Sequence, residues 1–397
     1  MNVHYDLAEA GDYEELIDFC NYVFSHANSP TDFPALLPKL YRREYFMQGR
    51  HYTAREDGRI RAVVGAYPLR LNVLGTVLPG RGIGMVSVHP YARSRGYMRT
   101  LMETALADMR RDGIVFGCLG GQRQRYEYFG FSPAGLRVVF ECHRTNIRHV
   151  LGKDFPPVFS LRQLSEGDKE LEDSYLIHQS KAARFERDRG KFFDILSSWK
   201  NRAVALSDEN GFAGYLVYRD SGYGDTGTAI QEINLKEPAR MIQAIGCFLN
   251  HLGRDCVWVD VQPWETEKLE IFSAFAENYR ITTAESFTVF DWQPLLSALL
   301  QLKTASGQVL PDGEALFRIS RGDNAAGSPD SCFRIAVEQG RAQVRSDTGE
   351  GAIVLDPLRA VRLFFSAAPW SCPALLNNPF LRGILPLPLF FETPDGI

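Results

Sequence analysis

The order of strand-like and helical segments in this sequence predicts an α/β fold built from three units. In the first unit, β-rich runs up to about residue 89 lead directly into an amphipathic helix and then a short buried strand. After residue 150, a similar order of sheet, helix, strand, helix and strand recurs. After residue 305, short β-like runs separated by glycines end in one helix. A chain of 397 residues is long enough for three units that each bury a core.

The first unit is expected to begin with helices and a hairpin. Asp57-Gly58 separates two β-rich runs, and this dipeptide in that position predicts a hairpin turn. The expected elements are helices at 12–27 and 32–44, strands at 51–56, 59–73 and 82–89, a helix from Met98 to Arg111, a strand at 114–119, a short helix at 122–129 and a strand at 138–142.

Residues 86–98 carry the clearest functional signal. Val86 and Val88 favour a strand, which Pro90 ends. From Met98 onward, apolar residues recur at spacings of three and four, as on one face of a helix. The first turn of that helix has unpaired backbone N–H groups and the positive end of the helix dipole, which suit a phosphate.

Between this strand and helix, Arg93 and Arg95 add positive charge, and Gly96 lets a ligand approach the backbone closely. The segment therefore predicts a socket for a pyrophosphate. Arginines at the start of a helix are also common on plain surface, so the segment alone does not establish the site.

The second unit lacks such a socket. A helix is expected at 165–186, and the turn at 234–240 contains no glycine and no paired arginines. We expect a structural copy of the first unit. In the third unit, a helix is expected from Asp356, an N-cap residue, with Pro357 in its first turn. The proline-rich tail after it is expected to be neither helix nor central strand, and to pack across another unit.

Composition narrows the class of protein. The formal net charge is −4 and no long basic run is present, so nucleic acid is not an expected partner. No apolar run approaches the ~20 residues that span a bilayer, and no secretory signal is visible, so we expect a cytoplasmic protein. The seven cysteines are scattered without metal-ligand spacing, so we expect free thiols and no metal.

The socket resembles the Arg/Gln-x-x-Gly-x-Gly/Ala signature of the GNAT acetyltransferases, with Arg93, Gly96 and Met98 at its three positions. Met98 departs from the usual small residue. Tyr126-Glu-Tyr-Phe-Gly-Phe131 resembles the Tyr-x-x-Phe-Gly-Tyr segment of the Eis-like (enhanced intracellular survival) acetyltransferases. The resemblance implies an active GNAT domain at 1–148, a degenerate GNAT-like domain at 149–302 and a sterol-carrier-protein-like α+β domain at 303–397. It also implies a binding site for acetyl-coenzyme A formed by Val86, Ser87, Val88, Arg93, Ser94, Arg95, Gly96, Tyr97 and Met98.

The resemblance also implies catalytic roles. Tyr126 would protonate the departing thiolate, although its residue type alone favours a role in aromatic packing. The backbone N–H of Val88 would hold the thioester carbonyl. The α-carboxylate of Ile397 would accept the proton of the amine, although the family often ends in an aromatic residue. Other candidates for the base are His26, His51, His89, Glu392 and Asp395.

Phe24, His26 and Phe33 are the expected substrate-binding residues. Family members acetylate primary amines such as aminoglycosides and lysine side chains, and form homo-oligomers, often hexamers. The resemblance thus implies an N-acetyltransferase acting on an aminoglycoside-like, lysine-bearing or polyamine-like amine. Two alternatives remain: a non-catalytic protein that binds coenzyme A or a lipid, and an aminoacyl transferase of the peptidoglycan type, which would use charged tRNA.

Overall fold

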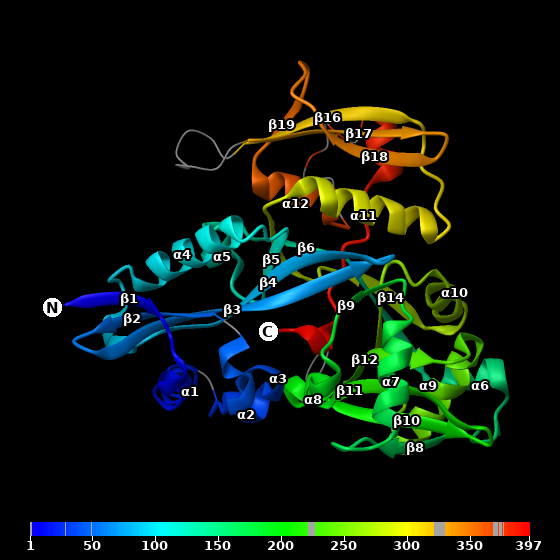
Figure 1. Cartoon of the computed structure of the whole chain (residues 1–397). Helices are drawn as coiled ribbons and strands as arrows, with labels where there is room; N and C mark the ends of the chain where they lie inside the picture. The colour runs from blue at the N-terminus through cyan, green and yellow to red at the C-terminus, as the bar shows by residue number, and fades with distance from the viewer. Residues whose placement is uncertain are drawn as a thin grey trace.

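The computed structural model describes residues 2–27, 29–48, 50–220, 227–320, 330–367, 372, 375 and 377–397, with only the backbone of Met47 and Gln48. These residues form three sheets with helices around them (Figure 1). Pro373, one of the prolines of the tail, lies outside the described residues. Within the described part, no helix combines the length and the apolar character that a membrane span requires.

The first sheet has the order β1-β2-β3-β4-β5-β15-β6, with β9 also paired to β3. The hairpin predicted at Asp57-Gly58 is confirmed, because β2 and β3 pair from Glu56 and Arg59 onward. The first unit contains β1 (Val3–Leu7), α1 (Tyr13–Ala27), α2 (Phe33–Leu36), α3 (Pro38–Tyr41), β2 (Arg50–Glu56), β3 (Arg59–Val73), β4 (Thr76–Val88), α4 (Tyr97–Arg111), β5 (Phe116–Leu119), α5 (Arg123–Glu127) and β6 (Ser132–Ala134), with short 3-10 turns η1 (Ala10–Asp12), η2 (Arg43–Gln48) and η3 (Pro90–Ala92).

The second sheet has the order β14-β7-β13-β12-β11-β10-β8. The chain from Arg137 to Val289 contains β7 (Arg137–His143), α6 (Arg144–Leu151), β8 (Ser160–Gln163), α7 (Glu170–Gln179), β9 (Ala183–Phe185), α8 (Phe192–Ser197), β10 (Arg202–Asp208), β11 (Gly211–Asp220), β12 (Thr228–Leu235), α9 (Met241–Leu252), β13 (Cys256–Val261), α10 (Thr266–Phe275), β14 (Asn278–Thr282) and β15 (Glu285–Val289), with 3-10 turns η4 (Arg189–Lys191), η5 (Ser198–Lys200) and η6 (Pro238–Arg240). Of these strands, β9 and β15 belong to the first sheet.

The first two units exchange one strand each. β7 follows the first unit in the chain, yet it lies between β13 and β14 of the second sheet. In return, β15 follows the second unit and lies between β5 and β6 of the first sheet. The sequence predicted strands at both places but not this exchange. Each sheet is therefore complete only in the presence of the other unit.

The third unit contains α11 (Trp292–Ala305), β16 (Gly313–Ile319), β17 (Ser331–Glu338), β18 (Arg341–Ser346), β19 (Ile353–Leu355), α12 (Pro357–Phe365), α14 (Pro379–Ile384) and η8 (Thr393–Asp395). Its sheet has the order β18-β17-β16-β19, and α11 and α12 lie between this sheet and the first one (Figure 1). Buried aromatic residues join these layers into one core, including Phe116, Trp292, Phe317, Phe364 and Phe390.

Three sequence expectations about helices are wrong. The helix expected at 32–44 is broken at Leu37, whose φ of −133° and ψ of 62° separate α2 from α3. The helix expected at 165–186 ends at Gln179, and the chain continues as β9, which pairs with Leu71–Val73 at the end of β3. The tail forms a helix, α14, because Asn378 caps its first turn and accepts hydrogen bonds from the N–H groups of Phe380 and Leu381. Pro379 fits there because the first turn needs no N–H donor from it. The expected packing of the tail is confirmed, since Leu387, Phe390 and Phe391 are buried in the shared core.

Candidate active site

A cavity of about 1030 Å³ opens beside the first sheet. It lies where β4 and β5 separate: the two strands pair in parallel from Gly80 to Gly82 only, and β4 continues to Val88 without β5. A bulge at Met85, which has φ 55°, bends β4 in the same region. The cavity is lined by residues of α1, α2, α3, β4, the start of α4, the segment 120–129, Trp199 and Ile397.

One end of the cavity has the features of a phosphate site. Gly96 is the N-cap of α4 with φ +83°. No side chain caps the first turn of this helix, and that turn contains no acidic residue. Arg93, Arg99 and Arg125 line the same end. Arg95 also lines it, but its guanidinium lies 2.5 Å from Glu56, so part of its charge is offset. The uncapped N–H groups and the arginines fit the phosphates of coenzyme A.

The edge of β4 that faces the gap offers a backbone donor. The N–H of His89 donates to the carbonyl of Arg61 on the β3 side. Because successive N–H groups of a strand point to opposite edges, the N–H of Val88 points to the side that β5 has left. Val86 and Val88 line the cavity, whereas the Ser87 hydroxyl turns toward α1 and donates to the carbonyl of Met85. The side chain of Ser87 therefore does not face the cofactor end.

Tyr126 on α5 lines the cavity and is 6% exposed. Burial raises the pKa of its phenol, and Arg125 opposes this shift. The ring packs over Gly121, which has φ +152°, and a Cβ there would lie 2.5 Å from Tyr126 Cε2. Tyr126 is thus a fully protonated hydroxyl at neutral pH, held in place beside the gap between the strands.

The tail reaches the same cavity from the far end of the sequence. Ile397 packs against bare β4 backbone, because a Cβ on Gly82 would overlap its Cδ1 and a Cβ on Gly84 would lie 2.5 Å from its Cγ2. The indole of Trp199 donates to the carbonyl of Gly396 at 3.0 Å, and Lys39 Nζ donates to the carbonyl of Pro394 at 2.5 Å. Ile397 and Tyr126 therefore line one cavity.

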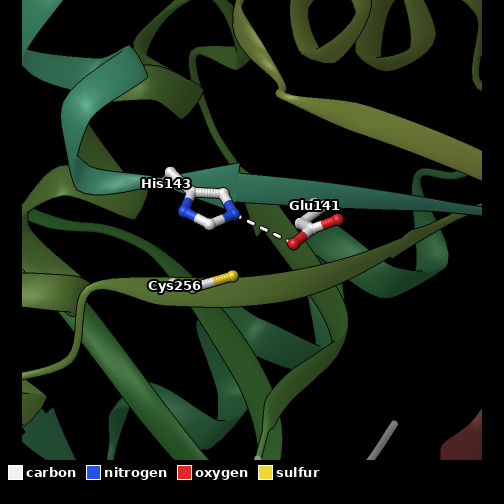
Figure 2. Close-up of side chains that lie close together, drawn as sticks. All are labelled: Glu141, His143 and Cys256. Atoms are coloured by element: carbon white, nitrogen blue, oxygen red, sulfur yellow. Dashed lines mark hydrogen bonds and ion pairs between the residues drawn. The ribbon is translucent and has the colours of Figure 1, made fainter.

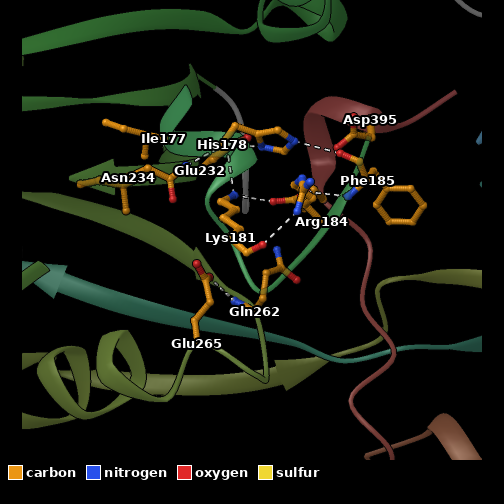
Figure 3. Close-up of polar contacts among 12 residues, drawn as sticks. Ile177, His178, Lys181, Arg184, Phe185, Glu232, Asn234, Gln262, Glu265 and Asp395 are labelled. Carbon is orange, nitrogen blue, oxygen red and sulfur yellow. Dashed lines mark hydrogen bonds and ion pairs between the residues drawn. The ribbon is translucent and has the colours of Figure 1, made fainter. Parts of the chain in front are cut away.

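Buried ion pairs hold this tail to the second unit (Figure 3). Arg187 bridges Glu232 and Asp395 at 2.8 and 2.9 Å, and Lys181 Nζ lies 2.6 Å from Glu392. All these side chains are nearly inaccessible to solvent. Burial opposes the charge on Glu392, but Lys181 and Arg187 outweigh it and lower the pKa of that carboxyl. Glu392 and Asp395 are thus structural ion-pair partners rather than free bases.

The histidines considered as bases lie away from the cavity lining. Burial lowers the pKa of His51 to about 4, and its ring stacks on Phe46 and contacts the Tyr67 hydroxyl. His89 stacks on Tyr22, and burial lowers its pKa. His26 also lies beside Tyr22, with ring centroids 6.1 Å apart.

Of the expected substrate residues, Phe24 and Phe33 line the cavity, but His26 does not. The rings of Phe24 and Phe33 are in edge-to-face contact, with their centroids 4.9 Å apart. Sequence reasoning missed Tyr41, Met85 and Trp199, which line the same end. A signal for the seat of Ile397 was present, because glycines at 80, 82 and 84 leave one face of β4 bare.

A second group of reactive side chains lies outside the cavity. Cys256 on β13 lies opposite His143 on β7, and Glu141 is on the same face as His143 (Figure 2). Each offers one potential metal-ligand atom, and these atoms lie within 4.8 Å of one another. His143 is already hydrogen-bonded to Glu141 at 2.9 Å, and burial raises the pKa of Cys256 to about 11. Spacing along the sequence does not reveal this trio, because the pairing of β7 with β13 brings its members together.

Residues 4–134 match the family described as acetyltransferase (GNAT) domain. The first unit is an N-acetyltransferase domain. The match spans α1 to β6 and includes the socket of 86–98 and Tyr126. GNAT domains use acetyl-coenzyme A as the acyl donor, and the uncapped start of α4 agrees with this use.

Solved structures resemble the acetyltransferase over nearly its full length. A probable N-acyltransferase from Enterococcus faecalis V583 has a TM-score of 0.69 at 17% identity, covering 98% of this chain and 100% of that one. A GCN5-related N-acetyltransferase from Kribbella flavida has a TM-score of 0.67 at 15% identity, covering 98% of each chain. Eis1 from Mycobacterium abscessus has a TM-score of 0.62 at 14% identity, covering 100% and 99%. At such identities the likeness shows a common fold. No curated protein sequence matches the chain.

Proposed function

We propose that this chain is an Eis-like enzyme that transfers the acetyl group of acetyl-coenzyme A to a primary amine. The supporting observation is that one cavity gathers the uncapped start of α4, the free edge of β4 at Val88, Tyr126 and Ile397. The start of α4 and the edge at Val88 both belong to the segment 86–98, whereas Ile397 comes from the opposite end of the sequence. A protein that only binds coenzyme A has no need for the last two groups.

The proposed step balances with these residues alone. The amine attacks the thioester carbon as a free base, after its proton passes to the α-carboxylate of Ile397. The C–N bond forms while the N–H of Val88 stabilises the carbonyl oxygen. The C–S bond then breaks, and the Tyr126 hydroxyl gives its proton to the sulfur. As the C–S bond breaks, the nitrogen loses its second proton, which returns through water to the tyrosinate, and Ile397 releases the first proton to solvent. The products are an N-acetylated amine, coenzyme A and one proton.

Several finer parts of this reading stay predictions. These are the boundaries at 148 and 302, the sterol-carrier-like character of the third unit and assembly into a homo-oligomer such as a hexamer. Light scattering on the purified protein measures the last of these. The aminoglycoside, lysine and polyamine classes of acceptor also stay predictions.

Replacing Tyr126 tests the proposed chemistry. We expect Tyr126→Phe to lower kcat by roughly 100-fold or more, because it removes the proton donor to the leaving thiolate. The KM for acetyl-coenzyme A should stay within about twofold, since the phosphate end is untouched. Thiol release with a primary-amine panel is the measurement.

The matched control is Tyr279→Phe, which removes a hydroxyl from a tyrosine that is 59% exposed and outside the cavity lining. It should leave kcat unchanged. Full activity of Tyr126→Phe would show that the leaving thiolate takes its proton from another group.

A further inference from the structure

The two ends of the cavity differ in charge. All four arginines of its lining, at 93, 95, 99 and 125, belong to the α4 and α5 end. The opposite end is formed by side chains of α1, α2, α3, β4 and η5. Its main residues are Phe24, Phe33, Leu37, Tyr41, Met85 and Trp199. Among the described residues that line the cavity, none is an aspartate or a glutamate.

Two polar side chains at this aromatic end already have hydrogen-bond partners. The Tyr41 hydroxyl accepts a hydrogen bond from Tyr67 at 2.9 Å, and the Trp199 indole donates to Gly396. The side-chain carboxylates of the tail, Glu392 and Asp395, are paired with Lys181 and Arg187. A cationic group that enters this end therefore meets rings and aliphatic side chains rather than a second anion.

This arrangement sets how many charges an acceptor can bring. Transfer of an ammonium group into an apolar site without a partner carries a large desolvation cost. The proposed catalytic carboxylate can compensate one such charge, that of the reacting amine. Further ammonium groups of a polyamine or aminoglycoside would find no carboxylate in the lining. An aromatic or aliphatic body, by contrast, gains from burial against Phe24, Phe33 and Trp199.

We infer that the acceptor is a monoamine whose amino group is attached to an aromatic or aliphatic body, with the body seated between Phe24, Phe33 and Trp199. This inference rests on the proposed acetyl transfer to an amine. It differs from the expectation of a polycationic acceptor, because the described lining residues include no acidic side chain to pair with additional ammonium groups.

A panel of acceptors tests this selectivity. 2-Phenylethylamine and n-hexylamine represent the apolar monoamines, and spermidine and kanamycin represent polycations. With acetyl-coenzyme A as donor, kcat/KM for the apolar monoamines should exceed that for the polycations by about 10-fold or more, from burial of the body alone. Equal or higher kcat/KM for the polycations would overturn the inference while leaving amine acetylation intact.

The variant Phe24→Ala tests whether the apolar body of the acceptor binds beside Phe24. It should lower kcat/KM for 2-phenylethylamine about 10-fold and leave the KM for acetyl-coenzyme A unchanged. The control is Tyr22→Ala, which removes an aromatic ring from the same helix at a position outside the cavity lining. This control should leave both parameters unchanged. An identical loss in both variants would contradict the assigned seat.

Direct binding separates the two proposals. Calorimetry of 2-phenylethylamine with the protein saturated by coenzyme A should show binding that weakens in Phe24→Ala. Binding without any acetyl transfer would support the acceptor seat and overturn the proposed function. The absence of both binding and transfer would overturn both.

Discussion

Burial determines the protonation of single residues around the cavity. It raises the pKa of the Tyr126 phenol, which keeps this hydroxyl protonated at neutral pH. Burial lowers the pKa of Lys39 to about 7, although Asp395 opposes the shift, so this lysine beneath the tail carries only part of a charge at neutral pH. It also lowers the pKa of His51 to about 4, which keeps that ring neutral between Phe46 and Tyr67. Burial thus sets the protonation of these three side chains, in contrast to Glu392, where the charges of Lys181 and Arg187 outweigh it.

His51 gives the fold a defined pH dependence. Its pKa falls from 6.5 in the unfolded chain to about 4 in the folded one. Its contribution is therefore fully present above pH 6.5 and is lost as the pH falls toward 4, because only the unfolded chain takes up the proton. The loss amounts to about 3 kcal/mol. Urea unfolding should show that the unfolding free energy of the unaltered protein falls by about 3 kcal/mol relative to that of His51→Gln as the pH is lowered from 7 to 4.

The control for this comparison is His4→Gln on β1, where the histidine is exposed. Its unfolding free energy should follow that of the unaltered protein at every pH. A constant difference between His51→Gln and the unaltered protein from pH 7 to pH 4 would contradict the prediction.

At the scale of elements, β4 organises the site. It pairs with β3 along its length, leaves β5 after Gly82 and bulges at Met85. Its glycines at 80, 82 and 84 share one face, which Phe116 and Ile397 cover. One strand therefore provides the donor edge and the seat for the end of the tail.

A methyl group on β4 should displace the tail. Gly82→Ala places a Cβ in the space of Ile397 Cδ1, so the Ile397 side chain must shift, and we expect kcat to fall by roughly 10-fold as the carboxylate moves from the amine. Steady-state kinetics measure this fall. Gly11→Ala is the control, because a Cβ there meets nothing within 4 Å.

The double variant Gly82→Ala with Ile397→Ala removes the colliding atoms and should recover part of the lost kcat. No recovery would indicate that the added methyl group damages β4 itself.

The sequence predicted most individual strands and helices of this region, but it did not predict the contacts between residues far apart in the chain. The hairpin of β2 and β3, the strand β4 and the helix α4 follow from turn chemistry and hydrophobic spacing, which are local. Tyr126 was accessible through a local motif for the same reason. Trp199 and the strand exchange were not, because they depend on contacts between residues far apart in sequence. Ile397 came from family resemblance, and its seat on Gly82 and Gly84 comes from the structure.

At the scale of the whole molecule, the tail connects all three units. It leaves the third unit, enters the shared core at Leu387, forms ion pairs with the second unit and ends against the first (Figure 1). The second unit thus contributes to the site by holding the tail. Arg187 is central to this role, because it contacts Glu232 and Asp395 together.

Loss of Arg187 should therefore affect stability and catalysis. We expect Arg187→Met to lower the unfolding free energy by about 3–5 kcal/mol, because it leaves Asp395 buried without its partner. The kcat should fall as the tail loosens. Urea unfolding and steady-state kinetics measure the two effects.

Arg189→Met removes the exposed pair with Glu172 and serves as control, with an expected change within about 0.5 kcal/mol. A similar small change for Arg187→Met would show that the buried pairs do not anchor the tail.

The strand exchange also bears on how the protein is made. The strand that separates β5 from β6 ends at Val289, so a growing chain must be synthesised through this residue before the first sheet can close. Until then β5 and β6 have unpaired edges, which are prone to pairing with other chains. Final assembly of the first unit therefore waits for the ribosome to finish a strand that lies about 150 residues further along the chain than β6.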